Sequence, residues 1–174
     1  MMKKLNNKGF TLIELLAVIV ILAVVMAIAA RSVLGVMSNS KKSSLNDSAI
    51  SAKRSFDNAY AEYAVTQDGT IVGFTGTDFD ANGRKNMTKA AFDELGISSK
   101  DYELDTSDPI TNTGNYSFVY FKDNQFIVCL VATPNGSFYD AKLAGKNSDT
   151  GVTGSNLTGM WACSNGNNSW TTTS

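Results

Sequence analysis

The chain has 174 residues, with 15 Lys and Arg against 16 Asp and Glu, and it contains no histidine. This length suits one domain, or one long helix joined to a modest globular head. The balanced charge lacks the basic stripe of a nucleic-acid-binding protein. Without histidine, Ser–His and Cys–His nucleophiles are excluded, and no HExxH, CxxC, P-loop or GxSxG motif occurs. We therefore predict no enzyme activity, no cofactor, no metal site and no nucleic-acid partner for the chain alone.

An apolar segment lies close to the N-terminus, from Phe10 to Ala30, and only Thr11 and Glu14 in it are polar. At about 1.5 Å per residue, a helix of this length spans roughly 31 Å, close to the ~30 Å hydrocarbon core of a bilayer. A carboxylate in such a segment is costly unless a partner compensates its charge. The sequence therefore predicts a transmembrane helix over 10–30 whose acid, Glu14, has a partner.

The short basic segment before this run leaves three interpretations open. A secretory signal would be cut near Ala27-Ile28-Ala29, which leaves Glu14 in the apolar region without a role. A plain membrane anchor explains the N-terminal lysines and the length, but it does not explain Glu14. The third interpretation is a processing site, because the segment from Lys8 to Glu14, KGFTLIE, closely resembles the cleavage motif of type IV prepilins and their pseudopilin relatives.

In that family, a membrane-embedded prepilin peptidase cuts after the glycine and methylates the new N-terminal residue. The resemblance therefore implies that residues 1–9 are a leader peptide, that the bond between Gly9 and Phe10 is cut, and that Phe10 becomes N-methylphenylalanine. Glycine has no side chain to obstruct the peptidase at the cut bond. The resemblance also implies that the new terminal amine pairs with Glu14 of a neighbouring subunit, where pairing offsets the desolvation of both charges.

Helical periodicity continues beyond the membrane segment. Apolar residues recur at three- and four-residue steps from Leu45 to Tyr63, and Gln67-Asp68-Gly69 is a suitable helix end. Segment 10–67 is therefore predicted to form one spine helix of about 55 residues, roughly 80 Å long. Many pilins have a proline that bends this helix, and none occurs here. Two alternatives stay open: the helix melts locally near Gly35 during assembly, or it stays helical there and curves gently.

Residues 68–174 are predicted to form a globular head. Segment 70–86 is predicted to be a loop with one short strand at 71–74, and within it 78–83 is predicted to be a turn, since the glutamate of a calcium loop is missing. Thr88 is predicted to cap a helix over 89–95 that Gly96 ends. The acids in loops, Asp105 among them, are predicted to be solvated.

Four strands are predicted, at 116–122, 125–133, 138–143 and 160–163. Asp123-Asn124 joins the first two and is typical of a hairpin. Apolar residues on both faces of 125–133 predict a central strand that lies on the spine helix. Alternating positions are predicted to share one face: Phe118, Tyr120, Ile127, Cys129 and Val131.

The two cysteines, Cys129 and Cys163, enclose a polar, Gly- and Ser-rich segment that is expected to have little core of its own. A disulfide between them would stabilise the head by roughly 3–4 kcal/mol on the loop-entropy model. Two buried free cysteines are the alternative. The tail from Ser164 to Ser174 is predicted to be mobile or to lie on the surface.

The resemblance is sharp over 8–30 and extends to the rest of the chain at the level of architecture. It implies an α+β pilin fold, in which a long N-terminal helix packs on an antiparallel sheet of about four strands. It also implies a structural subunit that polymerises with copies of itself into a type IV pilus for adhesion, twitching motility or biofilm formation. The implied partners are the prepilin peptidase and an ATP-driven assembly platform. The resemblance also implies that the subunit resides in the cytoplasmic membrane before assembly and in the extracellular pilus afterwards.

Two other functions stay open. A pseudopilin of a type II secretion or DNA-uptake system would build a short piston instead of a surface fibre. A membrane-tethered binding domain that does not polymerise would keep its N-terminus uncut and would tolerate changes at Glu14.

Overall fold

The computed structural model describes residues 10–66, 84–106, 114–122, 125–134, 136–140, 145–150 and 156–168. The chain divides into two compact units, Met1–Met37 and Ser38–Ser174, which we call the anchor unit and the head unit. The predicted strand at 71–74 and the predicted turn at 78–83 lie outside the described residues.

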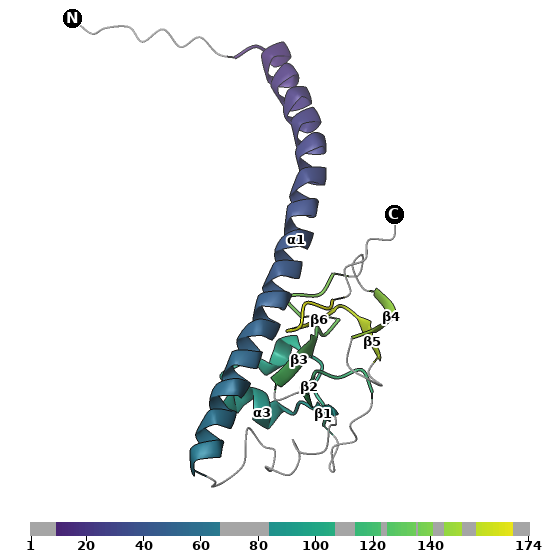
Figure 1. The fold of residues 1–174 in the computed structure, drawn as a ribbon. Helices are drawn as coiled ribbons and strands as arrows, with labels where there is room; N and C mark the ends of the chain where they lie inside the picture. Colours follow the sequence, from purple (N-terminus) through teal and green to yellow (C-terminus); the bar gives the residue numbers. More distant parts are fainter. Residues whose placement is uncertain are drawn as a thin grey trace, which may run out of the picture. The chain divides into compact units, whose positions relative to one another are not determined.

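One long helix, α1, runs from Leu12 to Thr66 over 55 residues (Figure 1). It ends directly before the predicted stop at 67–69, so the prediction of a single spine helix is confirmed. The N-terminal part of this helix is long and apolar enough to cross a membrane, as judged by length and composition alone. The helix is continuous through Gly35 in the single chain, and melting during assembly stays a prediction.

The head unit contains a four-stranded antiparallel sheet in the order β1-β2-β3-β6. Its strands are β1 (Arg84–Asn86), β2 (Phe118–Lys122), β3 (Gln125–Val131) and β6 (Trp161–Cys163). Lys122 pairs directly with Gln125, so only two residues join β2 to β3 and the predicted hairpin is confirmed. The central position of β3 and the strand at β6 are confirmed as well.

Two strand predictions are wrong. Strand β1 lies in the segment predicted to be a loop, and its sequence Arg-Lys-Asn has no strand pattern, so its extended form depends on pairing with β2. The predicted strand at 138–143 is a turn and coil at its described residues, 138–140. Phe138 and Tyr139 supply the misleading apolar pattern because they pack on the core, and the Phe138 ring stacks on Tyr102 with centroids 5.6 Å apart.

A second, two-stranded sheet was not predicted. It consists of β4 (Gly145–Asp149) and β5 (Asn156–Gly159), which pair antiparallel with an irregularity between Gly145 and Ser148. Both segments are rich in Gly, Asn and Asp, residues that are depleted in strands. Sequence alternation therefore gave no indication of this pairing.

Apolar side chains form two clusters, one on each face of the four-stranded sheet. The helix-side cluster contains Leu45, Ala49, Ala52 and Phe56 of α1, together with Phe126, Val128 and Leu130 of β3, and others. Rings of Phe56 and Phe126 lie 5.8 Å apart. The disulfide-side cluster contains Phe118, Tyr120, Cys129 and Val131, with Ile127 packed against it, which confirms the predicted shared face. Every apolar side chain of β3 is thus used on one face or the other.

A short helix, α3, runs from Lys89 to Glu94 and packs Ala91 and Phe92 into the core. Its N-cap is Thr88, whose hydroxyl accepts a hydrogen bond from the Ala91 N–H at 3.3 Å. Gly96 follows with φ of 69°, a backbone conformation that side chains disfavour. Both predicted boundary residues of this helix are confirmed.

The prediction that Asp105 is solvated is wrong. Its side chain is buried and accepts a hydrogen bond from Asn86 Nδ2 at 2.7 Å, while Arg84 Nε donates to Asn86 Oδ1 at 2.9 Å. Arg84 also lies over the Phe118 ring, 4.4 Å from its centroid. The network joins β1 to the 103–106 segment, because Asp105 N–H also donates to the Met87 carbonyl.

A second buried acid, Asp101, anchors the turn after β3. It ends the 3₁₀ helix η1 (Ser99–Asp101) and accepts hydrogen bonds from the Ser137 N–H at 3.0 Å and the Ser137 hydroxyl at 2.9 Å. The bond from the Ser137 backbone is the main cause that lowers the pKa of this carboxyl below its ordinary value, and burial opposes it.

A carboxyl whose pKa is lowered by folding stabilises the protein above its unfolded pKa, and this stability is lost as the pH falls through the folded value. We therefore expect the free energy of unfolding to decrease as the pH falls below about 4. Asp101→Asn keeps an oxygen acceptor but no charge, so it is expected to be less stable at pH 7 and to show a weaker acid dependence. Denaturant titrations at pH 7 and pH 3 would measure this, and an unchanged pH dependence in the variant would contradict it.

Candidate functional site

The start of α1 holds the one acid of the apolar segment in a defined geometry. Thr11 precedes the first helical residue, Leu12, and occupies the N-cap position. The Glu14 carboxylate accepts hydrogen bonds at Oε2 from the Thr11 N–H at 2.8 Å and from the Thr11 hydroxyl at 2.7 Å. In return, the Glu14 N–H donates to Thr11 Oγ1 at 3.3 Å. This reciprocal pair is a capping box, which satisfies backbone donors that a helix start otherwise leaves unpaired.

The capping box gives Glu14 a role inside its own subunit. It holds the carboxylate at the positive end of the helix dipole, where a negative charge is stabilised. Both bonds to the carboxylate use Oε2, and within the described residues no hydrogen bond is made by Oε1. The sequence interpretation missed this arrangement, although the spacing Thr-x-x-Glu at the start of an apolar run is its sequence signature. The geometry leaves one oxygen of a fixed carboxylate for a second positive group.

Thr11→Ala is expected to weaken the helix start by about 1 kcal/mol, because the N-cap hydroxyl is lost. Thr11→Ser keeps the hydroxyl and is expected to behave like the unaltered chain. Hydrogen exchange of the first turn of α1, in detergent micelles, would measure the difference. Equal protection of residues 12–15 in the alanine and serine variants would contradict a capping role for Thr11.

Of the two predicted processing residues, the structure describes Phe10 but not Gly9. Phe10 is 90% exposed, directly before the capping box, whereas Gly9 lies outside the described residues. The structure therefore places Phe10 four residues before Glu14, and it leaves the cut itself as a prediction.

The anchor unit exposes an unusual amount of apolar surface. Nearly all of its large apolar side chains are exposed, from Leu12 at 85% through Ile28 at 69% to Met37 at 54%. Soluble monomers rarely expose contiguous apolar patches larger than a few hundred Å². Such a surface is typical of a segment that contacts a membrane or another apolar protein surface.

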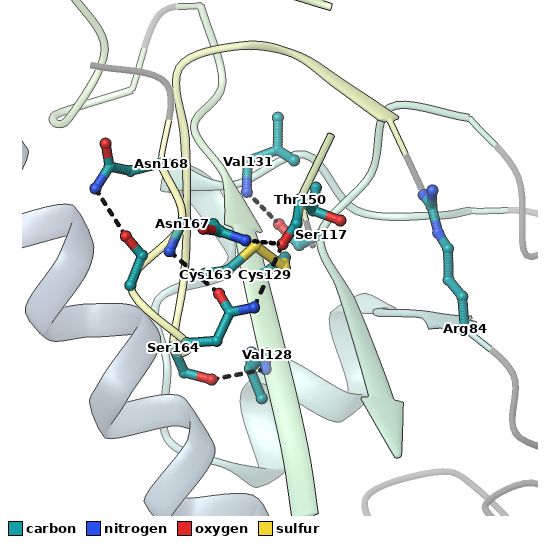
Figure 2. Close-up of a disulfide and its surroundings, with 12 residues drawn as sticks. Arg84, Ser117, Val128, Cys129, Val131, Thr150, Cys163, Ser164, Asn167 and Asn168 are labelled. Atoms are coloured by element: carbon teal, nitrogen blue, oxygen red, sulfur yellow. Dashed lines mark hydrogen bonds between the residues drawn. A yellow bond between two sulfur atoms is a disulfide. The ribbon is translucent and has the colours of Figure 1, made fainter. Parts of the chain in front are cut away.

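The two cysteines form a disulfide, so the alternative of free thiols is excluded (Figure 2). Cys129 of β3 lies directly opposite Cys163 of β6 in the strand register, with Cα atoms 4.0 Å apart. Both residues are fully buried in the disulfide-side cluster. The enclosed segment has more core than expected, because it contributes these buried apolar residues: Leu130, Val131, Ala132, Leu157, Met160, Trp161 and Ala162.

Where the structure describes it, the tail lies on the surface, which is the second of the two predicted alternatives, and hydrogen bonds hold it there. The Ser164 N–H donates to the Val128 carbonyl at 2.9 Å, and the Val128 N–H donates to Ser164 Oγ at 3.0 Å (Figure 2). The Cys163 N–H donates to the Asn167 carbonyl at 2.7 Å, and Asn168 bridges back to Ala162. The described tail residues therefore cover the outer edge of β6, and the rest of the tail lies outside the described residues.

Among the described residues there is no group of three or more His, Cys, Asp or Glu side chains placed to hold a metal ion.

Comparison with known proteins bears on this same segment. Residues 4–30 match the family model described as the prokaryotic N-terminal methylation motif. No curated protein and no solved structure matches the chain. The matched range contains Lys4 and Lys8, the Gly9–Phe10 junction, the capping box and the apolar part of α1. The chain therefore carries the N-terminal methylation signature of type IV prepilins and pilin-like proteins.

Proposed function

We propose that the chain is the precursor of a filament-building subunit of a type IV pilus. The observation that carries the proposal is the Glu14 carboxylate, which Thr11 holds at the start of an exposed apolar helix. Glu14 is the fifth residue after the proposed cut. Cleavage between Gly9 and Phe10 would create a positive amine close to this acid. In a bundle of apolar helices, neither charge is stable without an opposite charge.

In this proposal, the helix first anchors the subunit in the membrane and then packs against other helices in the filament. Segment 10–30 would anchor the subunit in the cytoplasmic membrane until an ATP-driven platform extracts it. In the filament, the exposed Leu, Ile, Val and Ala side chains would pack against those of neighbouring spines, which supplies most of the stability. The pairing of Phe10 with Glu14 of the partner subunit would fix the register. The head unit would carry adhesion, motility or biofilm functions.

Mass spectrometry of the mature chain tests the proposal. The expected N-terminus is N-methylphenylalanine at position 10, and Gly9→Leu is expected to leave the leader attached. Antibody labelling of sheared fibres in electron micrographs then tests polymerisation, and it separates a surface pilus from the short pseudopilus of a secretion or uptake system. A chain cut near Ala29, or an uncut chain in unaltered cells, would contradict the proposal.

A further inference from the structure

The part of α1 in the head unit carries two opposite charges on the face turned away from its own core. Asp47 and Arg54 are both exposed and lie seven residues apart, which is close to two helical turns and about 10.5 Å along the axis. The buried residues of this segment, Leu45, Ala49 and Ala52 among them, occupy the opposite side. The two charges are therefore aligned along one outward line of the helix.

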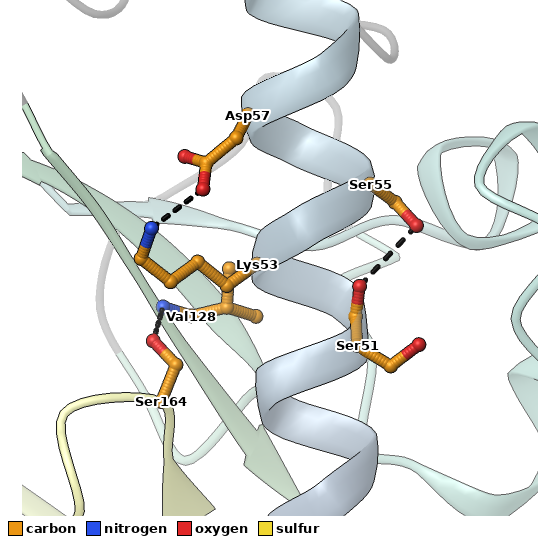
Figure 3. A network of polar contacts seen from close by, with 6 residues as sticks. All are labelled: Ser51, Lys53, Ser55, Asp57, Val128 and Ser164. Carbon is orange, nitrogen blue, oxygen red and sulfur yellow. Dashed lines mark hydrogen bonds and ion pairs between the residues drawn. The ribbon is translucent and has the colours of Figure 1, made fainter.

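Within the described residues, neither Asp47 nor Arg54 takes part in an ion pair; the ion pairs found on helices are Lys53–Asp57 and Lys89–Asp93. Lys53 and Asp57 differ, because they lie on the flank of the same helix and pair with each other, with Lys53 Nζ 2.5 Å from Asp57 Oδ2 (Figure 3). The i,i+4 spacing that permits this contact is absent between Asp47 and Arg54. Their charges are thus available to a second molecule.

We propose that this face of α1 docks on a second copy of the chain, with Asp47 of one subunit beside Arg54 of the partner subunit. The inference rests on the proposed function, because both need parallel spine helices with the same direction of offset. Phe10 placed level with Glu14 of the partner subunit corresponds to an offset of four residues, about 6 Å.

The same offset brings Asp47 level with residue 51 of the partner subunit, one turn (about 4.5 Å) before the partner's Arg54. Side chains on a helix lean toward its N-terminus, so the long side chain of the partner's Arg54 leans back toward that level. Without an offset, Asp47 and the partner's Arg54 would lie seven residues apart along the axis, about 10.5 Å. The offset that the N-terminal pairing requires therefore brings these two charges closer together, and the subunit that supplies Phe10 to the N-terminal pair also supplies Asp47 to this one.

The expected role of this contact is selection of register, because an exposed ion pair contributes little stability by itself. A like-charged pair in the same place would repel, and in a filament that repulsion would recur at every junction. Charge reversal is therefore a more sensitive test than removal of the charges.

The experiment uses the full chain in cells that assemble the filament. Asp47→Arg and Arg54→Asp are each expected to lower the yield of sheared fibres about tenfold, and the double reversal is expected to restore it. The control is the double exchange Lys53→Asp with Asp57→Lys, since it reverses two charges on the flank and keeps their ion pair, and its yield is expected to stay near that of the unaltered chain. Yields are normalised to subunit in the membrane, where protease resistance of the head reports its folding.

Normal yields for both single reversals would overturn the inference, and so would a double variant that remains as poor as the singles. An equal loss in the exchange of Lys53 and Asp57 would also overturn it, because the effect would not be specific to this face. In each of these cases the unaltered chain still forms fibres, so the proposed function stands. Failure of the proposed function would appear instead as an uncut chain without fibres.

Discussion

Glu14→Gln is expected to abolish filament formation while it leaves cleavage after Gly9 intact. Glutamine still presents an oxygen to the Thr11 N–H and hydroxyl, and it is the other residue that completes a capping box. The helix start is therefore preserved, and only the negative charge is removed. An unpaired Phe10 amine within the apolar bundle would cost about 3–5 kcal/mol at each junction, enough to reduce fibres below detection.

The measurement combines immunoblots of sheared fibres with the mass of the N-terminus. Thr11→Ala is the complementary control, because it removes capping and keeps the charge, so its fibres are expected to be reduced but present. Glu14→Gln chains that are correctly cut and still build normal fibres would show that the charge has no role in assembly. Glu14→Gln chains that are no longer cut would assign the acid to recognition by the peptidase.

Cys129→Ala together with Cys163→Ala is expected to lower the free energy of unfolding of the head unit by roughly 3–4 kcal/mol. The bridge closes the chain between β3 and β6, and without it the unfolded state gains the entropy of an open loop. Alanine is small and apolar, so the two substitutions place no polar group without a hydrogen bond in these fully buried positions. Marginal domains have stabilities of only 5–15 kcal/mol, so this loss is a large fraction of the total.

Denaturant unfolding of the full chain in detergent, followed by tryptophan fluorescence, would measure this loss, because Trp161 lies buried beside the bridge in the same cluster. Reductant is expected to bring the unaltered chain to the stability of the double variant and to leave the variant unchanged. If the variant and the unaltered chain unfold at the same denaturant concentration, the core holds β3 against β6 without the bridge.

Local patterns in the sequence were sufficient for the elements that depend on neighbours along the chain. The proline-free apolar periodicity gave the whole of α1, and Thr88 with Gly96 gave both ends of α3, because helix hydrogen bonds and caps join residues only a few positions apart. Alternation in two adjacent segments gave the β2–β3 hairpin and its two faces. The Thr11–Glu14 capping box was equally readable, since all its atoms lie within one turn.

Contacts between distant residues were decided only by the tertiary structure. Strand β1 and the β4–β5 pair have sequences that do not favour strands, so they form because a partner supplies their hydrogen bonds. Asp105 looks like a loop acid until the fold buries it against Asn86. The sequence alone does not decide whether two cysteines form a disulfide or remain free thiols. Here the strand register places Cys129 directly opposite Cys163, so the two can bond. The N-terminal chemistry was thus determined by the sequence itself, whereas the stability of the head depends on pairings that exist only once the chain has folded.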